Sequence, residues 1–571
     1  MEVIMKKGQL ASQGFAIAKA KRLLFNNHSI KESFIEDTFE AINRYDTAVS
    51  KSIEELENIK KQLYTIDQEF VSIFDAHIQM VKDPDIKRQT VALIEKHQWH
   101  PAYAYKKVTD EVIKTFKAME NLYFKARSSD VLDIQHRVLN HLLDIQALAE
   151  IKLNEDVIII AHDLTPSETA KLDLKHVKGF ITEVGGVTSH TAIMARALNI
   201  PSIVAYKHAL NEINDDDIVV LDGLNDELLI NPDEQVLSKK RQAHEDYVKQ
   251  LKKLQAYVNK KTYTKDQFHI PLYANVGSEI DITHSNEVGA EGIGLYRTEF
   301  LFFNKKTPPT EEEQYKEYKK AFDANEPVMI RTLDVGGDKP LLFLENEEEI
   351  NPYLGFRGMR ISLAEKTVFK TQIRAILRAA KNSREAHILL PMVSRLDELF
   401  EVKRTINEVV EELKRSSIEY QNTIRIGVMI EVPSVAFNAK RFAKHVDFFS
   451  IGTNDLTQYF YAADRMNQKV SHLNDYFDPL LLNLLQHVIH AAHDENIPVG
   501  VCGEMAQDLH ASLLLVGMGV DELSMTPNRI LTIREQLKKF STEELRILSD
   551  DVLSLEDADS VRRHIDDYIL R

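Results

Sequence analysis

The chain has 571 residues, 44% of them hydrophobic and 28% charged, as in a folded globular protein of roughly three or four domains. Its net charge of −17 at pH 7 argues against nucleic acid or a membrane surface as a general partner. Cys502 is the single cysteine, which excludes an intrachain disulfide and a cysteine-built zinc site and fits the reducing cytoplasm. No apolar run of about 18 residues predicts a membrane span, and residues 1–20 lack the apolar core of a signal peptide.

The first half of the chain is dominated by a helical stretch. Glycine is absent from Phe15 to Lys178, which excludes a glycine-rich phosphate loop there. Apolar residues recur at helical spacing, as at Ile53, Leu56 and Ile59, and Asp83-Pro84 and His100-Pro101 predict breaks between long helices. We therefore expect a helical bundle or hairpin array over residues 23–145.

A small α/β domain follows. Thr165-Pro166-Ser167-Glu168 has the form of a helix-capping box. The N-terminal segment Gly8–Ala20 is also strand-like and could complete this domain, in which case the helical region is an insertion. The domain would then comprise residues 1–22 and 146–230. Its other predicted strands are 157–160, 179–184, 201–206 and 217–222.

A turn in this domain carries the most distinctive residues. Gly185-Gly186 opens it, hydroxyl residues follow, and His190 then stands at or near the start of a predicted helix. Free backbone N–H groups and the helix dipole favour an anion at that position. His190 is therefore a candidate nucleophile that carries a phosphoryl group. Taken alone, one of 21 histidines is better explained as a residue of an ordinary strand-to-helix turn.

Residues 231–261 are predicted to form a charged linker helix with Tyr247, Leu251, Leu254 and Val258 on one face, although an ordinary surface helix would show the same stripe. From residue 262 to 571, strand-like and helical runs alternate. Eight such units over some three hundred residues predict a (β/α)8, or TIM, barrel. The predicted strands are 270–276, 292–296, 328–333, 388–393, 424–430, 448–451, 499–502 and 522–525.

Reactive side chains follow five of these strands, at the barrel end where active sites lie. Arginines offer forked donors for phosphate and carboxylate, and Glu431 and Asp455 offer the hard oxygen ligands that Mg²⁺ prefers. Asn454 can orient a substrate oxygen, and Cys502 can act as an acid because a thiol is protonated at neutral pH. Phosphoenolpyruvate fits this set. Singly, each group is better explained as a structural ion pair or a buried thiol. The charged strand ends are 297–299, 331–334, Glu431, 452–455 with Arg465 downstream, and 502–504.

Seven segments in the same order resemble Enzyme I of the bacterial phosphoenolpyruvate:sugar phosphotransferase system. They are GGVTSHTAIMARAL, GAEGIGLYRTEFLF, RTLDVGGDK, NPYLGFRGMR, SIGTNDLTQY, AADRMN and VCGEMA. Residues 70–84 and 122–134 also resemble that family's helical domain. The resemblance implies a swivelling phosphohistidine α/β domain, an inserted helical domain over 23–145 that binds the phosphocarrier protein HPr, a linker helix, and a C-terminal barrel that binds phosphoenolpyruvate and dimerises.

The resemblance also implies roles for single residues. Mg²⁺ would be held by Glu431 and Asp455. His190 would take the phosphoryl group and pass it to HPr, while Cys502 would protonate the enolate to give pyruvate. Phosphate and carboxylate would be held by Arg297, Arg331, Asn454, Asp455 and Arg465, with Lys339 and Arg357 in support.

Three positions depart from the family pattern: Val187 stands where arginine is usual, Tyr206 where threonine is usual, and Gln507 where glycine is common. Val187 removes a positive charge three residues before His190. Two related classes of enzyme are less favoured. A pyruvate-phosphate dikinase or phosphoenolpyruvate synthase needs a nucleotide-grasping domain, and the nitrogen-related paralogue needs a sensory domain. A binding protein that has lost turnover is the third alternative.

Overall fold

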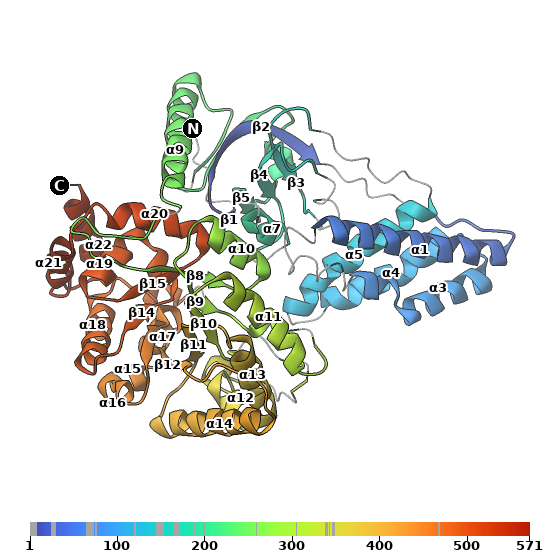
Figure 1. The fold of residues 1–571 in the computed structure, drawn as a ribbon. Coiled ribbons are helices and arrows are strands. Elements are labelled where there is room, and N and C mark those ends of the chain that lie inside the picture. Colours follow the sequence, from blue (N-terminus) through green and yellow to red (C-terminus); the bar gives the residue numbers. More distant parts are fainter. Residues whose placement is uncertain are drawn as a thin grey trace. The chain divides into compact units, whose positions relative to one another are not determined.

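The computed structural model describes the chain in segments, which form two compact units, residues 1–250 and 251–571 (Figure 1). The described residues are 8–23, 30–63, 74, 77–118, 122–143, 153–164, 169, 172–186, 190–197, 200–225, 227–258, 260–303, 305–336, 341, 343–344, 349–465, 467 and 469–570. Within them, no helix is long and apolar enough to cross a membrane. The predicted capping box at 165–168 lies outside the described residues.

The first unit contains a seven-stranded sheet in the order β1-β5-β4-β3-β2-β6-β7. Strand β2 pairs in parallel with β3, although the helical stretch separates them in sequence, so the predicted insertion is confirmed. The sequence analysis missed β7, which pairs antiparallel with β6. The strands are β1 (Gln9–Ser12), β2 (Phe15–Leu23), β3 (Val157–Ala161), β4 (Val177–Thr182), β5 (Ser202–Val204), β6 (Ile218–Asp222) and β7 (Glu227–Ile230).

The inserted helices begin where the sequence predicts them to begin. Helix α3 starts at Pro84, and its cap residue Asp83 accepts hydrogen bonds from the backbone N–H groups of Asp85 and Ile86. Helix α4 starts at Pro101. The helices of this unit are α1 (Thr38–Leu63), α3 (Pro84–His97), α4 (Pro101–Ala118), α5 (Leu122–Leu142), α7 (His190–Ala197), α8 (Ala209–Glu212) and α9 (Glu234–Gln255).

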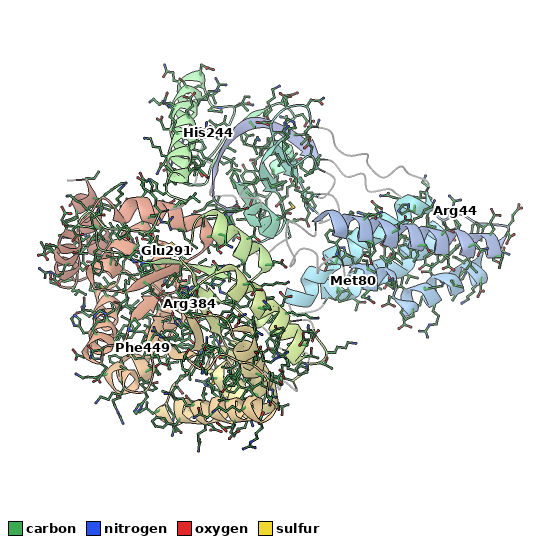
Figure 2. The ribbon with its side chains drawn as sticks, in the orientation of Figure 1. Arg44, Met80, His244, Glu291, Arg384 and Phe449 are labelled. Carbon is green, nitrogen blue, oxygen red and sulfur yellow. The ribbon has the colours of Figure 1, made fainter. Side chains whose placement is uncertain are left out.

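Helix α9 packs on the small sheet through a cation and aromatic rings. Lys240 bonds Asp222, which is fully buried, at 2.8 Å. His244, labelled in Figure 2, meets the ring of Phe15 edge to face at 5.2 Å. The predicted helical stripe through Val258 was wrong, because α9 ends at Gln255. The carbonyl of Tyr257 instead accepts a hydrogen bond of 2.7 Å from the buried Arg534, so the chain leaves the helix there.

The second unit is a closed barrel of eight parallel strands, each pairing with its sequence neighbours, as predicted. Phe449 in Figure 2 belongs to one of these strands and to the large core between barrel and helices. A Cβ at Gly427 would overlap the ring of Phe448, so glycine there leaves room for an aromatic ring inside the barrel. The strands are β8 (Leu272–Val276), β9 (Ile293–Tyr296), β10 (Val328–Arg331), β11 (Ala386–Leu390), β12 (Arg425–Ile430), β13 (Phe448–Ile451), β14 (Val499–Val501) and β15 (Glu522–Met525).

Helices surround the barrel and several begin with well-formed caps. Thr310 and Glu313 form a reciprocal capping box at the start of α11. The α-helices of this unit are α10 (Glu279–Glu287), α11 (Glu311–Ala324), α12 (Met359–Ala364), α13 (Lys366–Ala379), α14 (Leu396–Arg415), α15 (Pro433–Ala436), α16 (Ala439–Ala443), α17 (Thr453–Phe460), α18 (Pro479–Asp494), α19 (Leu509–Gly517), α20 (Pro527–Leu537), α21 (Thr542–Val552) and α22 (Ala558–Ile569).

Candidate active site

The predicted charged residues lie at one end of the barrel, above an apolar layer. Successive inward positions on a strand are two residues apart, so Arg331 follows Met329 and Glu431 follows Met429 on the inner face. Both methionines belong to a small buried cluster inside the barrel, with Leu295, Leu389, Phe448 and Cys502. The charged groups therefore stand on an apolar floor, where electrostatic interactions are stronger than in water.

Arg331 is held between two carboxylates. Its guanidinium lies 3.1 Å from Glu299 and 2.9 Å from Asp334, and its side chain is only 12% exposed. These carboxylates keep its pKa above the ordinary value despite burial. Its buried Nε has no hydrogen-bond partner among the described residues, so one donor is unused.

Arg357 forms the most extensive ion pairs of the site. It contacts both oxygens of Asp334 at 3.2 and 3.3 Å and both oxygens of Asp455 at 3.0 and 3.1 Å. It also donates to the Tyr459 hydroxyl at 3.1 Å. A planar guanidinium is the only side chain that can hold two carboxylates in this bidentate manner. Arg357, expected only to support the site, is therefore central to it.

Glu431 adds a further carboxylate beside these two. It is 1% exposed, and burial together with the nearby Asp334 and Asp455 raises its pKa to about 8. A carboxylate placed against others in this way favours a bound cation. Glu431 and Asp455 thus fit the predicted Mg²⁺, which takes one or two carboxylates and completes its coordination with substrate oxygens and water. Among the described residues, no group of three or more potential ligands forms a complete metal cage.

Two further arginines border the site with donors to spare. Arg465 Nη1 lies 3.8 Å from Asp455 and has no hydrogen-bond partner among the described residues. Arg297 directly follows β9 and is exposed. Asn454, in the first turn of α17, accepts a hydrogen bond from the backbone of Glu504 at 2.9 Å, which leaves its amide N–H groups available. The site can thus bind an anion with several oxygens.

Cys502 lies at the end of β14 and is 5% exposed. Its Sγ–H donates to the carbonyl oxygen of Ile451 at 3.6 Å, and burial raises the pKa of the thiol to about 11. The thiol therefore remains protonated through the neutral range, so it carries the proton that a general acid must donate. Asn275, bonded to the Cys502 carbonyl at 3.0 Å and to Ser524 Oγ at 2.6 Å, fixes the backbone beneath it.

Gln372 was missed by the sequence analysis. It is 1% exposed on α13, accepts from the Leu333 backbone at 3.0 Å and donates to Thr298 Oγ1 at 3.1 Å. Thr298 in turn donates to the Arg331 carbonyl at 2.9 Å. One amide therefore ties together the loops that follow β9 and β10. No local motif marks such a residue, because its partners come from distant segments.

The structure places His190 at the first residue of α7, as predicted, but its side chain lies outside the described part of the chain. Val187 and Lys339 also lie outside it. Tyr206 is buried and bonds Glu212 at 2.8 Å, whereas Gln507 accepts from Thr526 at 2.9 Å, so both departures have local partners.

Known proteins match the chain over nearly its whole length. Residues 251–542 match the PEP-utilising enzyme, PEP-binding domain, residues 153–226 the mobile domain and residues 7–127 the N-terminal domain of these enzymes. A phosphoenolpyruvate-protein phosphotransferase of Bacillus sp. (strain S) is 42% identical over 97% of this chain and 96% of its own. That of Bacillus subtilis is 41% identical over 97% and 98%. A solution structure of Enzyme I (nEIt) is 34% identical to this chain and matches 42% of it and 98% of the solved chain, with a TM-score of 0.37.

Proposed function

Since the chain belongs to the family of phosphoenolpyruvate-protein phosphotransferases, we propose that its barrel binds phosphoenolpyruvate and that His190 accepts the phosphoryl group. The observation that carries this proposal is the buried arginine–carboxylate network at the barrel's carboxyl end, with unused donors on Arg331 and Arg465. A substrate with a phosphate and a carboxylate supplies the acceptors that these donors lack. The reaction releases pyruvate, and the phosphocarrier protein HPr then accepts the phosphoryl group from His190.

In this mechanism, Arg297, Arg331 and Arg465 bind the substrate's phosphate and carboxylate, and Asn454 orients one of its oxygens. Arg357 keeps Asp334 and Asp455 in place while the anion enters. The donors are fixed before the substrate arrives, so little reorganisation is needed as charge spreads over the transferring group. Mg²⁺, held by Glu431 and Asp455, would supply charge neutralisation for the phosphate.

Transfer breaks the bond between the phosphorus and the bridging enol oxygen and forms a bond from phosphorus to a ring nitrogen of His190. The electron pair stays on the oxygen as enolpyruvate. Cys502 then delivers its thiol proton to the terminal carbon of this enolate, which gives pyruvate, and the thiolate regains a proton from solvent. The raised pKa of the thiol supports this role because the proton is present at neutral pH.

The remaining assignments complete the proposal. Residues 1–22 with 146–230 carry His190 between the barrel and its acceptor, residues 23–145 bind HPr, and 231–261 link the units. Residues 262–571 bind phosphoenolpyruvate and form a homodimer. Phosphoenolpyruvate is an intracellular metabolite, which supports a cytoplasmic location. The parallel pairing of β2 with β3 supports the insertion on which this division rests.

The test is single-turnover labelling of the full chain with phosphoenolpyruvate bearing labelled phosphate and Mg²⁺. We expect label on His190, loss of that label on addition of HPr, and no label in His190→Ala. His176→Ala, which changes a histidine at the other edge of the same sheet, is the matched control and should label normally. A folded wild-type protein that takes no label would refute the transfer reaction and favour the non-catalytic alternative.

A further inference from the structure

Arg357 uses every N–H donor of its guanidinium on other parts of the protein. Nε and Nη2 donate to Asp334 at 3.2 and 3.3 Å, while Nη2 and Nη1 donate to Asp455 at 3.1 and 3.0 Å. The second hydrogen of Nη1 goes to the Tyr459 hydroxyl at 3.1 Å. A guanidinium has about five N–H donors and no acceptor, so none remains for a substrate oxygen. Arg357 therefore acts on the site through the groups that it holds, and Tyr459 is the one that is not a carboxylate.

The Tyr459 hydroxyl has a second partner. It donates its hydrogen to the backbone carbonyl of Tyr353 at 2.5 Å, because a carbonyl oxygen can only accept. Toward Arg357 the same hydroxyl oxygen accepts, and donation in one direction strengthens acceptance in the other. Tyr459 lies in α17, four residues after Asp455. Residues at this spacing share one face of a helix, so α17 presents a carboxylate and a hydroxyl to the same guanidinium.

The Tyr353 carbonyl belongs to segment 349–356, which lies between β10 and α12. Two apolar side chains of this segment face solvent, Ile350 at 96% exposure and Leu354 at 66%. Arg360 in α12 holds the Leu354 carbonyl at 2.8 Å. A segment that buries few apolar side chains has low local stability, so single hydrogen bonds decide where it lies. The Tyr459 hydroxyl thus joins an exposed segment to the buried ion pairs.

These contacts give the hydroxyl a task at the barrel site. We propose that Tyr459 is a positioning residue, which fixes the rotation of the Arg357 guanidinium and through it the orientation of Asp455, the proposed magnesium ligand. Without the hydroxyl, a charged N–H is left unpaired on a side chain that is only 8% exposed. The guanidinium would then turn toward another acceptor and move Asp455 with it. The inference rests on the proposed function and deepens it by naming a residue on which metal binding depends.

The rival explanation is that the Tyr459 ring only fills space. Tyr459→Phe separates the two explanations, because it keeps the ring and removes the hydroxyl alone. The chain offers a matched control in Tyr568 on α22, whose hydroxyl donates to the backbone carbonyl of Glu544 on α21 at 2.9 Å. Tyr459→Phe and Tyr568→Phe each delete one bond from a hydroxyl to a carbonyl. General destabilisation should therefore be similar in both variants, which urea unfolding checks.

The first experiment measures single-turnover labelling of the full chain by phosphoenolpyruvate over a range of Mg²⁺ concentrations. We expect Tyr459→Phe to raise the Mg²⁺ concentration for half-maximal labelling about tenfold, as for one lost hydrogen bond to a charged group. The labelling rate at saturating Mg²⁺ should fall by less than about threefold, because the arginines that bind the substrate are unchanged. Tyr568→Phe should match wild type in both quantities.

The second experiment needs neither metal nor turnover. Mass spectrometry follows hydrogen exchange of the backbone amides of segment 349–356 in the full chain without Mg²⁺. We expect exchange to be about tenfold faster in Tyr459→Phe than in wild type, because the segment loses its bond to α17. Exchange over the same segment should be unchanged in Tyr568→Phe.

The outcomes separate this role from the proposed function. A wild-type Mg²⁺ dependence in Tyr459→Phe would show that the ring alone matters and would overturn the positioning role. An equal shift in Tyr568→Phe, or unchanged exchange over segment 349–356 in Tyr459→Phe, would overturn it as well. In each of these cases wild type still takes label, so the proposed function stands. An unlabelled wild type would instead remove the proposed function and the positioning role with it.

Discussion

Charged side chains lie at the carboxyl ends of parallel strands in two places, one in a closed barrel and the other in an open sheet. In the barrel, the Arg357 side chain is 8% exposed and its partner Asp334 is 3% exposed. At the carboxyl end of the small sheet, the His162 side chain is 67% exposed although its Nδ1 contacts Glu183 at 2.8 Å. Similar strand geometry therefore gives one buried and one solvent-facing set of charges.

The difference follows from the number of neighbours that each topology supplies. A closed ring brings the ends of eight strands together, so Arg331 and Arg357 each find two carboxylates there. An open edge offers only the few ends of β3, β4 and β5, and its charges remain in water. The closed arrangement suits a site that holds a substrate still. The open arrangement suits a group that must be offered to a donor and then to an acceptor.

The largest combined effect on stability and activity should come from breaking the barrel's central ion pairs. Arg357→Gln leaves Asp334 and Asp455 buried without their shared cation, which should cost about 3–5 kcal/mol of stability. Labelling by phosphoenolpyruvate should fall about 10²–10³-fold. Urea unfolding and single-turnover labelling measure the two losses. Arg378→Gln, which removes an arginine on the outer surface of α13, is the control. Equal losses in both variants would contradict the contrast between buried and exposed charge.

Next comes the acid of the barrel. Cys502→Ala removes the proton donor and should slow pyruvate formation about 10²–10⁴-fold while phosphoenolpyruvate binding changes little. Because burial raises the thiol pKa to about 11, pyruvate formation in wild type should show no loss from thiol ionisation between about pH 7 and 9. Rapid-quench assays of pyruvate and equilibrium binding of substrate separate the two steps. Parallel loss of binding and turnover would identify Cys502 as a packing residue.

Much of this comparison could be predicted from the sequence, because the relevant signals are local. The eight strands are short β-branched or apolar runs, and the residue after each run is fixed at the barrel's carboxyl end by topology. The sequence alone therefore predicts that Arg297, Glu431 and Cys502 lie together at this end of the barrel. The glycine pair and the helix-forming residues around His190 likewise predict that it lies at the start of a helix, and α7 begins there.

The partners of these groups could not be predicted, because ring closure decides them. Nothing near Arg357 in the sequence indicates that it binds both Asp334 and Asp455, the latter 98 residues away. The contact between Gln372 and Leu333 likewise spans 39 residues. Helix α9 ends before the predicted Val258 for the same reason, since Arg534 binds the carbonyl of Tyr257, which is 277 residues away. Long-range contacts of this kind leave no local pattern.

Gln372 tests whether the barrel site depends on fixed loops. Gln372→Leu removes the amide that joins the Thr298 and Leu333 loops, so Arg331 loses its alignment while its charge is kept. We expect kcat/KM to fall about 10²-fold, as for a displacement of about 1 Å in a catalytic group. Gln372→Glu, which keeps the acceptor for Leu333, should recover part of the activity.

The matched control for this change is Gln421→Leu. Gln421 is also buried and bonds backbone groups, including Thr423 N at 3.0 Å, at the other end of the barrel. It should affect stability without changing KM. If Gln421→Leu lowered kcat/KM as much as Gln372→Leu, the loss would reflect general destabilisation, and the loop-fixing role would be withdrawn.

The smallest expected effect concerns His387, which lies in β11 beside the ring of Phe448 at 5.1 Å. Both ring nitrogens are buried without a hydrogen-bond partner among the described residues, and burial with the charge of Arg425 lowers the pKa to about 4. The folded state therefore holds neutral imidazole, while the unfolded chain takes up a proton below about pH 6.5. The stability due to this group is present above pH 6.5 and is lost as pH falls toward 4. Between pH 7.5 and 5, wild type should lose about 2 kcal/mol more stability than His387→Phe. Urea unfolding of both proteins at the two pH values measures this difference, and equal losses would show that the barrel tolerates an unpaired buried charge, contrary to the contrast drawn here.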